Sequence, residues 1–575
     1  MTRDDDLHIR LGRIRSRGIR SRPFIAQALA AAEKAGGLAH PSRRARAGKF
    51  GRGRVASLFA SRLTDRSRRV VVKARVVRHR VNRAPLGAHL AYLRREGVTK
   101  DGAAGRMFDA ERDDTEHRAF AERCEGDRHH FRFIVSPDDA TELSDLKTFT
   151  RDLMVQAQRD FGTRLDWVAV DHWNTAHPHV HVIIRGRADD GQDLVISRDY
   201  IREGMRARAE GLVTRELGPR SEQEIRQSLE GEIEAERWTR LDQALARESG
   251  RNGAIIDLRP DRYRKAHDLQ TMKIGRMRRL ERLGLAHQVG PGQWTLAENA
   301  EPTLRALGER NDIIRRIHRG LAEHGWERAT SSFVLTSEAQ PSPVIGRLVA
   351  RGLDDELMGT AYAVIDGTDG RAHHIRLPDL DAAGDSGPGS IVELRRYEDS
   401  KGRPRLALAV RSDLSVEAQV KANGATWLDR QLLARGATSL CDGGFGRELS
   451  EAMEVRVEFL VSEGLARWQG QRVIFIRDLL DTLRRRELDT AGAKISAETG
   501  LPYHSLAEGE TIAGVYRQRV SLASGRFAMI DDGLGFSLVP WTPSLERQLG
   551  RQVSGVVRSG STIDWSFGRK RGLGL

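Results

Sequence analysis

Four histidines fall within ten residues of this 575-residue chain, in the segment DHWNTAHPHVHVIIRG (171–186). Side chains two residues apart on a β-strand point to the same face, so His179 and His181 are expected to point together. His177 has the same parity, but Pro178 interrupts the strand before it. The apolar residues that surround the pair favour a buried strand over a polar turn.

His172 ends the preceding run of strand-like residues. If the two strands are neighbours in a hairpin, its imidazole can reach the same point as those of His179 and His181. Three imidazoles with open coordination positions suit a divalent metal that also holds phosphate oxygens. The sequence therefore predicts a metal site made by His172, His179 and His181.

Hydrophobic periodicity around the cluster predicts a mixed domain. Four runs are typical of strands, at 70–77, 129–137, 166–173 and 179–186. Three helical patterns separate or follow them, at 87–98, about 144–160 and from Tyr200 to about 247. This order predicts the α+β class, with helices flanking an antiparallel sheet, in a domain at 66–250.

The charge of the chain favours nucleic acid as its partner. The formal net charge is +15, and a basic protein is attracted to phosphate backbones. Residues 1–60 hold 14 Lys or Arg against 4 Asp or Glu, so 1–65 is interpreted as a disordered basic arm. Metal-dependent hydrolysis of a small molecule fits this charge poorly.

Other features exclude several classes. The two cysteines, Cys124 and Cys441, have no CxxC partner, so neither a disulfide framework nor a cysteine-based zinc site is expected. No run of about 18 apolar residues occurs, and no membrane insertion is expected. These features favour the cytoplasm.

The second half of the sequence contains a weak internal duplication. The segments 277–296 and 455–476 each place an apolar-periodic helix before Gly-Leu-Ala and a short hairpin, and 359–370 resembles 525–535. A helical module followed by a small β-barrel is therefore expected twice. The predicted winged-helix-like modules are 255–325 and 420–505, and the predicted barrels are 330–415 and 507–575.

The histidine segment resembles the HUH endonucleases, and among them the relaxase/mobilisation nucleases of plasmid conjugation and T-DNA transfer. The resemblance covers residues 68–250 and is carried by His172-Trp-Asn174-Thr-Ala-His177-Pro178-His179-Val-His181. It implies an HUH-type antiparallel sheet and Mg²⁺ or Mn²⁺ on His172, His179 and His181. Asn174 stands where the family usually has an aspartate that supports a ligand histidine. Asp171, Asn174 and His177 are the expected second shell.

The resemblance also implies a tyrosine nucleophile before the histidines, which Tyr92 in GAHLAYLRREGVTKDG (87–102) matches. A phenol needs a polarised phosphate and basic neighbours to attack, and Arg94 and Arg95 are expected to supply charge and to contact DNA. Trp173 is a candidate for base stacking, although it is equally suited to a core. Tyr200 is the rival nucleophile, since replication initiators of the superfamily carry theirs after the histidines.

The expected function is that of a relaxase that nicks single-stranded DNA at a transfer origin through a 5′-phosphotyrosine intermediate. Duplex DNA, accessory transfer proteins and a type IV secretion coupling protein are the other expected partners. Two alternatives stay open: an HUH-type replication initiator or transposase that uses Tyr200, and a DNA-binding scaffold whose catalytic site has decayed.

Overall fold

The structure is a computed structural model that describes residues 52–53, 66–79, 86–95, 97–173, 177–251, 253–259, 268–335, 343–399, 402–434, 440–507, 509–546, 548–558 and 562–566. The chain forms two compact units, Met1–Glu301 and Pro302–Leu575. Both combine helices with mainly antiparallel sheets, which confirms the α+β class. Apart from Arg52 and Gly53, the predicted basic arm lies outside the described residues. None of the helices in the described ranges is long and apolar enough to cross a membrane.

A four-stranded sheet forms the centre of the first unit. Its order is β1-β2-β4-β3, and every neighbouring pair is antiparallel. The strands are β1 (Val70–Arg78), β2 (His129–Pro137), β3 (Trp167–His172) and β4 (His179–Arg185). The four predicted strands therefore pair in one sheet.

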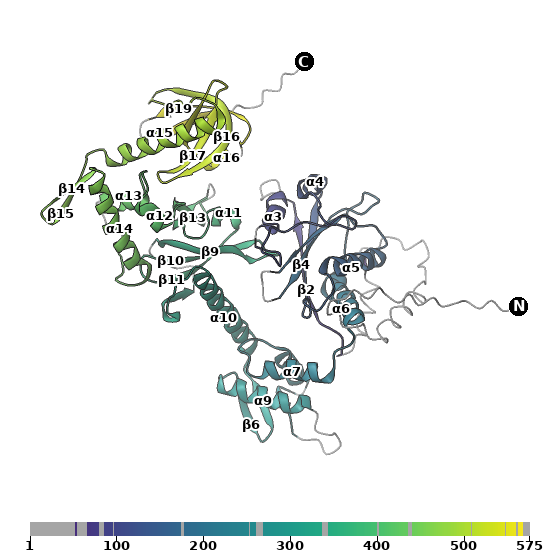
Figure 1. Cartoon of the computed structure of the whole chain (residues 1–575). Helices are drawn as coiled ribbons and strands as arrows, with labels where there is room; N and C mark the ends of the chain where they lie inside the picture. The colour runs from purple at the N-terminus through teal and green to yellow at the C-terminus, as the bar shows by residue number, and fades with distance from the viewer. Residues whose placement is uncertain are drawn as a thin grey trace, which may run out of the picture. The chain divides into compact units, whose positions relative to one another are not determined.

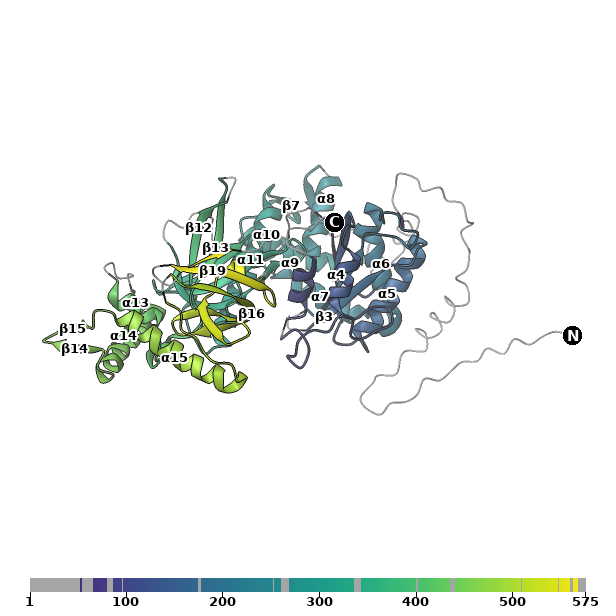
Figure 2. The same ribbon diagram turned by 90° about the horizontal axis from the view of Figure 1, so that it is seen from above.

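The two faces of this sheet pack against different helices, because successive side chains of a strand point to opposite faces. One face builds a core that includes Phe131, Phe133 and Val182. It packs against α5 (Leu146–Phe161) and α6 (Met205–Leu217), which lie side by side in both views (Figure 1, Figure 2). The other face packs against α3 (Leu86–Leu93) and α4 (His117–Arg123), with Val170 and Ile183 in its core.

Local signals fix the ends of the longest of these helices. The Asp145 side chain accepts hydrogen bonds from the backbone N–H groups of Lys147 and Thr148 at the start of α5. Gly162 ends the helix with a φ of +63°, a left-handed conformation that glycine adopts at low cost.

A helical module with a hairpin occurs twice in the chain. The first copy contains α7 (Glu222–Ile233), α8 (Arg240–Arg251), α9 (Asp268–Arg282) and a sheet of β5 (Ile255–Asp257), β7 (Gln293–Leu296) and β6 (Ala286–Gly290). The second contains α12 (Val416–Val420), α13 (Trp427–Leu433), α14 (Gly444–Ser462) and the hairpin β14 (Ala466–Gln469) and β15 (Arg472–Phe475). The helix-then-hairpin order predicted at both places is present.

An equivalent buried ion pair lies within each of the two copies. In the first, Nε and Nη2 of Arg276 donate to the two oxygens of Asp242, at 2.8 and 2.9 Å. In the second, the same atoms of Arg456 donate to Asp429, at 2.8 and 2.8 Å. All four residues are fully buried. Each arginine also donates to three backbone carbonyls of its own copy, those of Ile233, Ala235 and Arg237 or of Val420, Ala422 and Gly424.

A long helix and a β-sheet follow each module. Helix α10 (Ala300–Ala322) precedes a sheet of order β13-β12-β9-β10-β11-β8, and α15 (Leu479–Thr499) precedes a sheet of order β18-β17-β16-β19-β20. The strands of the first sheet are β8 (Phe333–Leu335), β9 (Ile345–Asp355), β10 (Thr360–Gly367), β11 (Ala372–Leu377), β12 (Ile391–Glu398) and β13 (Pro404–Ser412). Those of the second are β16 (Thr511–Leu522), β17 (Gly525–Asp531), β18 (Phe536–Pro540), β19 (Gln552–Arg558) and β20 (Thr562–Ser566).

Apart from the extra strand β8, the two sheets have the same strand order. Each also has one short helix between its third and fourth shared strands, α11 (Leu380–Ala383) or α16 (Pro543–Glu546). The duplication predicted from short sequence echoes thus extends over whole modules. In the described residues the hydrogen bonding leaves both sheets open, so a closed barrel stays a prediction.

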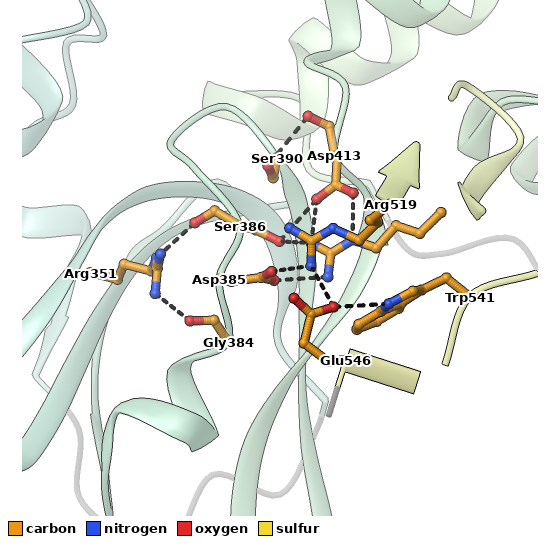
Figure 3. A network of polar contacts seen from close by, with 10 residues as sticks. Arg351, Gly384, Asp385, Ser386, Ser390, Asp413, Arg519, Trp541 and Glu546 are labelled. Carbon is orange, nitrogen blue, oxygen red and sulfur yellow. Dashed lines mark hydrogen bonds and ion pairs between the residues drawn. The ribbon is translucent and has the colours of Figure 1, made fainter. Parts of the chain in front are cut away.

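Charged side chains join the two sheets of the second unit (Figure 3). Arg526 donates through Nε and Nη2 to the two oxygens of Asp413, both at 2.6 Å, and through Nη1 to Asp385 at 2.8 Å. Arg519 contacts the same Asp385. These carboxylates raise the pKa of Arg526 above its usual value. The repeated sheets therefore meet through a polar contact.

Candidate metal centre and nucleophile

The three predicted ligand histidines lie together at one end of the β3–β4 pair. His172 is the last residue of β3 and pairs directly with His179, the first residue of β4. One ring nitrogen from each of His172, His179 and His181 lies within 4.8 Å of the others. The ring centroids are 4.5 to 5.4 Å apart. All three side chains are buried, on the sheet face that packs against α3 and α4.

Backbone carbonyls orient two of these rings. His172 Nε2 lies 2.8 Å from the carbonyl oxygen of Leu93, and His179 Nδ1 lies 3.0 Å from that of His177. Since a carbonyl only accepts, these nitrogens carry the protons, and the lone pairs are on His172 Nδ1 and His179 Nε2. His172 Nδ1 is buried without a hydrogen-bond partner in the described residues, as expected of a nitrogen that serves as a metal ligand.

The environment keeps His172 in its neutral, ligating form. Burial, and then the proximity of His181 and Arg95, lowers the pKa of His172 to about 2. A neutral imidazole is the form that binds a metal. The donor set fits a divalent cation, and nitrogen ligands favour Mn²⁺ over the harder Mg²⁺.

Tyr92 lies on the helix that contacts the histidines. It precedes Leu93, the last residue of α3, whose carbonyl accepts from His172. The Tyr92 ring is half-buried in the core under α3 and α4, and the guanidinium carbon of Arg95 lies 4.3 Å from its centroid. Arg94 instead donates to His117 Nδ1 at 2.7 Å. Arg95 is close enough to His172 to lower its pKa, Tyr92 shares with Leu93 the helix that contacts His172, and Arg94 is directed toward α4.

Tyr200 lies on the opposite face of the sheet. It begins a short π-helical turn, η2 (Tyr200–Gly204), and is fully buried in the core under α5 and α6. Its hydroxyl donates to Asp160 Oδ2 at 2.8 Å, and Arg208 holds the same carboxylate. Burial and the Asp160 charge raise the pKa of Tyr200. These contacts assign Tyr200 to the core and not to the histidine cluster.

The structure describes two of the three residues expected in the second shell. Asp171 accepts a hydrogen bond from Trp173 Nε1 at 2.6 Å, and strand alternation turns it away from His172. His177 contributes its backbone carbonyl, while its side chain is exposed. Asn174 lies outside the described residues. Backbone carbonyls therefore orient the rings of His172 and His179.

Trp173 is less available for base stacking than predicted. Its ring packs against the core under α5 and α6, and Lys100 Nζ lies 3.8 Å from the ring centroid on top of it. The core interpretation, left open from the sequence, fits these contacts better.

Sequence reasoning missed a group of basic residues on the histidine face of β1 and β2. Arg132 is the cross-strand partner of Arg75, and Lys73 is the partner of Ile134, which pairs on its other side with His181. The alternation of KARV in β1 and HHFRF in β2 was a usable signal. Only the strand register shows that the two arginines face each other.

Comparison with known proteins identifies a family for the second half. Two overlapping stretches, residues 273–405 and 394–574, match a family described as "Protein of unknown function (DUF3363)". No curated protein and no solved structure matches the chain. The two matched stretches together make up more than half of the chain. Tyr92 and the histidine cluster precede them. The chain belongs to the DUF3363 family of proteins of unknown function.

Proposed function

We propose that this protein is a relaxase, a metal-dependent tyrosine endonuclease that nicks and rejoins single-stranded DNA at a transfer origin. The observation that carries the proposal is the contact between α3 and the histidine cluster. The carbonyl of Leu93, the residue after Tyr92 and the last of the helix, accepts a hydrogen bond from His172 Nε2. The helix that carries the proposed nucleophile is thus joined by a hydrogen bond to one of the proposed metal ligands.

The reaction follows from the chemistry of the residues. The Oη atom of Tyr92 attacks the scissile phosphorus, its proton passes to solvent, and the bond to the 3′-oxygen breaks. The products are a 5′-phosphotyrosine and a free 3′-hydroxyl, and the reverse reaction restores the strand without ATP. Arg95, beside the Tyr92 ring, supplies positive charge as the phenol oxygen becomes anionic.

The metal has a limited and defined role. His172, His179 and His181 would hold Mn²⁺ or Mg²⁺, which when bound polarises the phosphate oxygens and offsets their charge. The neutral state of His172 keeps its lone pair available at physiological pH.

The partners follow from charge and from the expected chemistry. A net charge of +15 favours DNA, and the winged-helix-like modules are proposed to contact duplex next to the nick. Accessory transfer proteins and a type IV secretion coupling protein are proposed partners in the cytoplasm.

The replication-initiator alternative is disfavoured by Tyr200, which is buried and bonded to Asp160 on the other face of the sheet. The scaffold alternative is weakened because His172 and His179 are oriented by backbone carbonyls, so their support does not depend on an aspartate at position 174.

The test is a cleavage assay on single-stranded oligonucleotides from the DNA that flanks the gene, with Mn²⁺ or Mg²⁺. Denaturing gels should show a covalent protein–DNA adduct with the wild type, lost in Tyr92→Phe and retained in Tyr200→Phe, the matched control. An adduct that survives Tyr92→Phe and disappears in Tyr200→Phe contradicts the assignment. Binding without any adduct favours the scaffold.

A further inference from the structure

The sheet face that carries the histidines continues onto β1 and β2. Side chains that pair across antiparallel strands share a face, so His181, Ile134 and Lys73 lie in one row. Arg132 and Arg75 lie in the next row, two residues along. The diagonal between His181 and Arg132 is therefore about 7–8 Å between Cα atoms by antiparallel geometry. Arg75 and Arg132 therefore lie next to the histidine cluster.

Arg132 is held in an unusual way. Its Nε donates to His130 Nε2 at 3.0 Å, which fixes the His130 proton on Nδ1, and that nitrogen lies 2.6 Å from His79 Nε2. Burial, and then the charge of Arg132, lowers the pKa of His130 to about 2. The guanidinium is therefore oriented by a neutral ring.

Other arginines of this unit are held by carboxylates. Arg185 donates to Asp127 at 2.7 Å, and Arg208 donates to Asp160 at 2.7 Å. In the described part of the chain, Arg75 is the charged group that shifts the pKa of Arg132, lowering it together with burial to about 10, and no carboxylate contributes. Arg75 and Arg132 are like charges that face each other across two strands, so an anion bound beside Arg132 lessens the repulsion between them.

We propose that Arg75 and Arg132 form a phosphate-binding subsite, which takes a backbone phosphate of the single strand next to the scissile one. The inference rests on the proposed function, because it assigns the substrate path across the same sheet face. The guanidinium fork suits phosphate oxygens, and a neutral anchor leaves the charge of Arg132 uncompensated until the strand arrives. Lys73, exposed on the same face, extends the path.

The experiment measures equilibrium binding of a fluorescent 20-nucleotide single strand by anisotropy, in EDTA and over a range of salt concentrations. Without metal, binding is read separately from cleavage. Arg75→Gln and Arg132→Gln should each weaken binding about tenfold at low salt. Each should reduce the slope of log K against log salt by about 0.7, the value for one phosphate contact with a single strand.

Arg78→Gln is the matched control, since Arg78 is exposed on the same strand with the opposite parity. It should leave the slope unchanged, and Arg132→Lys should largely preserve it, which separates charge from folding. Slopes of Arg75→Gln and Arg132→Gln that equal that of Arg78→Gln overturn the subsite, as does a wild type that does not bind single strands.

The outcomes also separate this subsite from the proposed function. A smaller salt slope in Arg75→Gln and Arg132→Gln, with no adduct formed by the wild type in the cleavage assay, supports the subsite and rejects the nuclease. An adduct that depends on Tyr92, with unchanged slopes, rejects the subsite alone.

Discussion

At the scale of single residues, the proposed metal site depends on which nitrogen of each histidine ring carries the proton. The carbonyls of Leu93 and His177 accept hydrogen bonds from His172 Nε2 and His179 Nδ1, and one nitrogen of each ring lies within 4.8 Å of the others. A carbonyl fixes a tautomer as a carboxylate does, but it adds no formal charge. These two orientations therefore do not depend on a carboxylate at position 174.

Metal binding should distinguish the ligands from their neighbour. His179→Ala removes a proposed ligand. It should lower the affinity for Mn²⁺, measured by isothermal titration calorimetry, by about 10- to 100-fold. His177→Ala, the control, keeps the backbone carbonyl that orients His179 and should bind Mn²⁺ like the wild type. Equal losses in both variants would show that the imidazole of His177 is itself a ligand.

At the scale of elements, the side chains that share a face of one strand could be predicted from the sequence. The register between strands far apart in the sequence could not. Alternation correctly placed His179 and His181 on one face, and the hairpin placed His172 beside them. The same alternation, applied to Asp171, would have turned it away from His172. The Arg75–Arg132 pair was beyond reach, because it depends on the register between β1 and β2, which are separated by 50 residues of other structure.

The repeated modules show a similar limit. Arg276 and Arg456 each occur eight residues before the glycine of a Gly-Leu-Ala sequence, and each partner aspartate ends a Thr-x-Leu-Asp sequence. Composition alone assigns such arginines to the surface. Their burial becomes understandable once the aspartate and three carbonyls satisfy the guanidinium.

Breaking one of these pairs should be costly. Arg456→Met leaves Asp429 buried without its charge partner and should lower the free energy of unfolding by about 3–5 kcal/mol, measured in urea. Arg447→Met, at an exposed position of the same helix, should change it by less than about 0.5 kcal/mol. Adding Asp429→Leu to Arg456→Met should recover much of the loss, and a double variant no more stable than the single one would contradict the charge argument.

At the scale of the whole molecule, the family match and the histidine cluster lie in different halves of the chain. The second half belongs to a family of unknown function, while the histidine centre lies before the matched residues. The α+β class and the duplication were accessible from sequence because they depend on periodicity and repetition. The extent of the duplication was not, because the copies share strand order and a buried ion pair rather than long stretches of similar residues.

The stability of the second unit should depend on pH because of one buried histidine, His374. His374 is buried against Tyr362, with its ring planes 10° apart, and Arg316 donates to its Nε2 at 3.0 Å. Burial, and then the charge of Arg316, lowers the pKa of His374 from 6.5 to about 4. The folded state therefore keeps this ring neutral, while the unfolded chain takes up a proton below about pH 6.5.

The sign follows from the protons bound. Below pH 6.5 the unfolded state binds more protons than the folded state, so stability falls as the pH falls toward 4 and is restored above 6.5. From pH 7 to pH 5, His374 should account for a loss of about 2 kcal/mol in the urea transition of this unit. His374→Gln keeps an acceptor for Arg316 and should remove that part of the loss, whereas His318→Gln, at an exposed position of α10, should not. If His374→Gln and the wild type lose the same stability between these pH values, folding does not lower the pKa of His374, and the effect assigned to its burial beside Arg316 is incorrect.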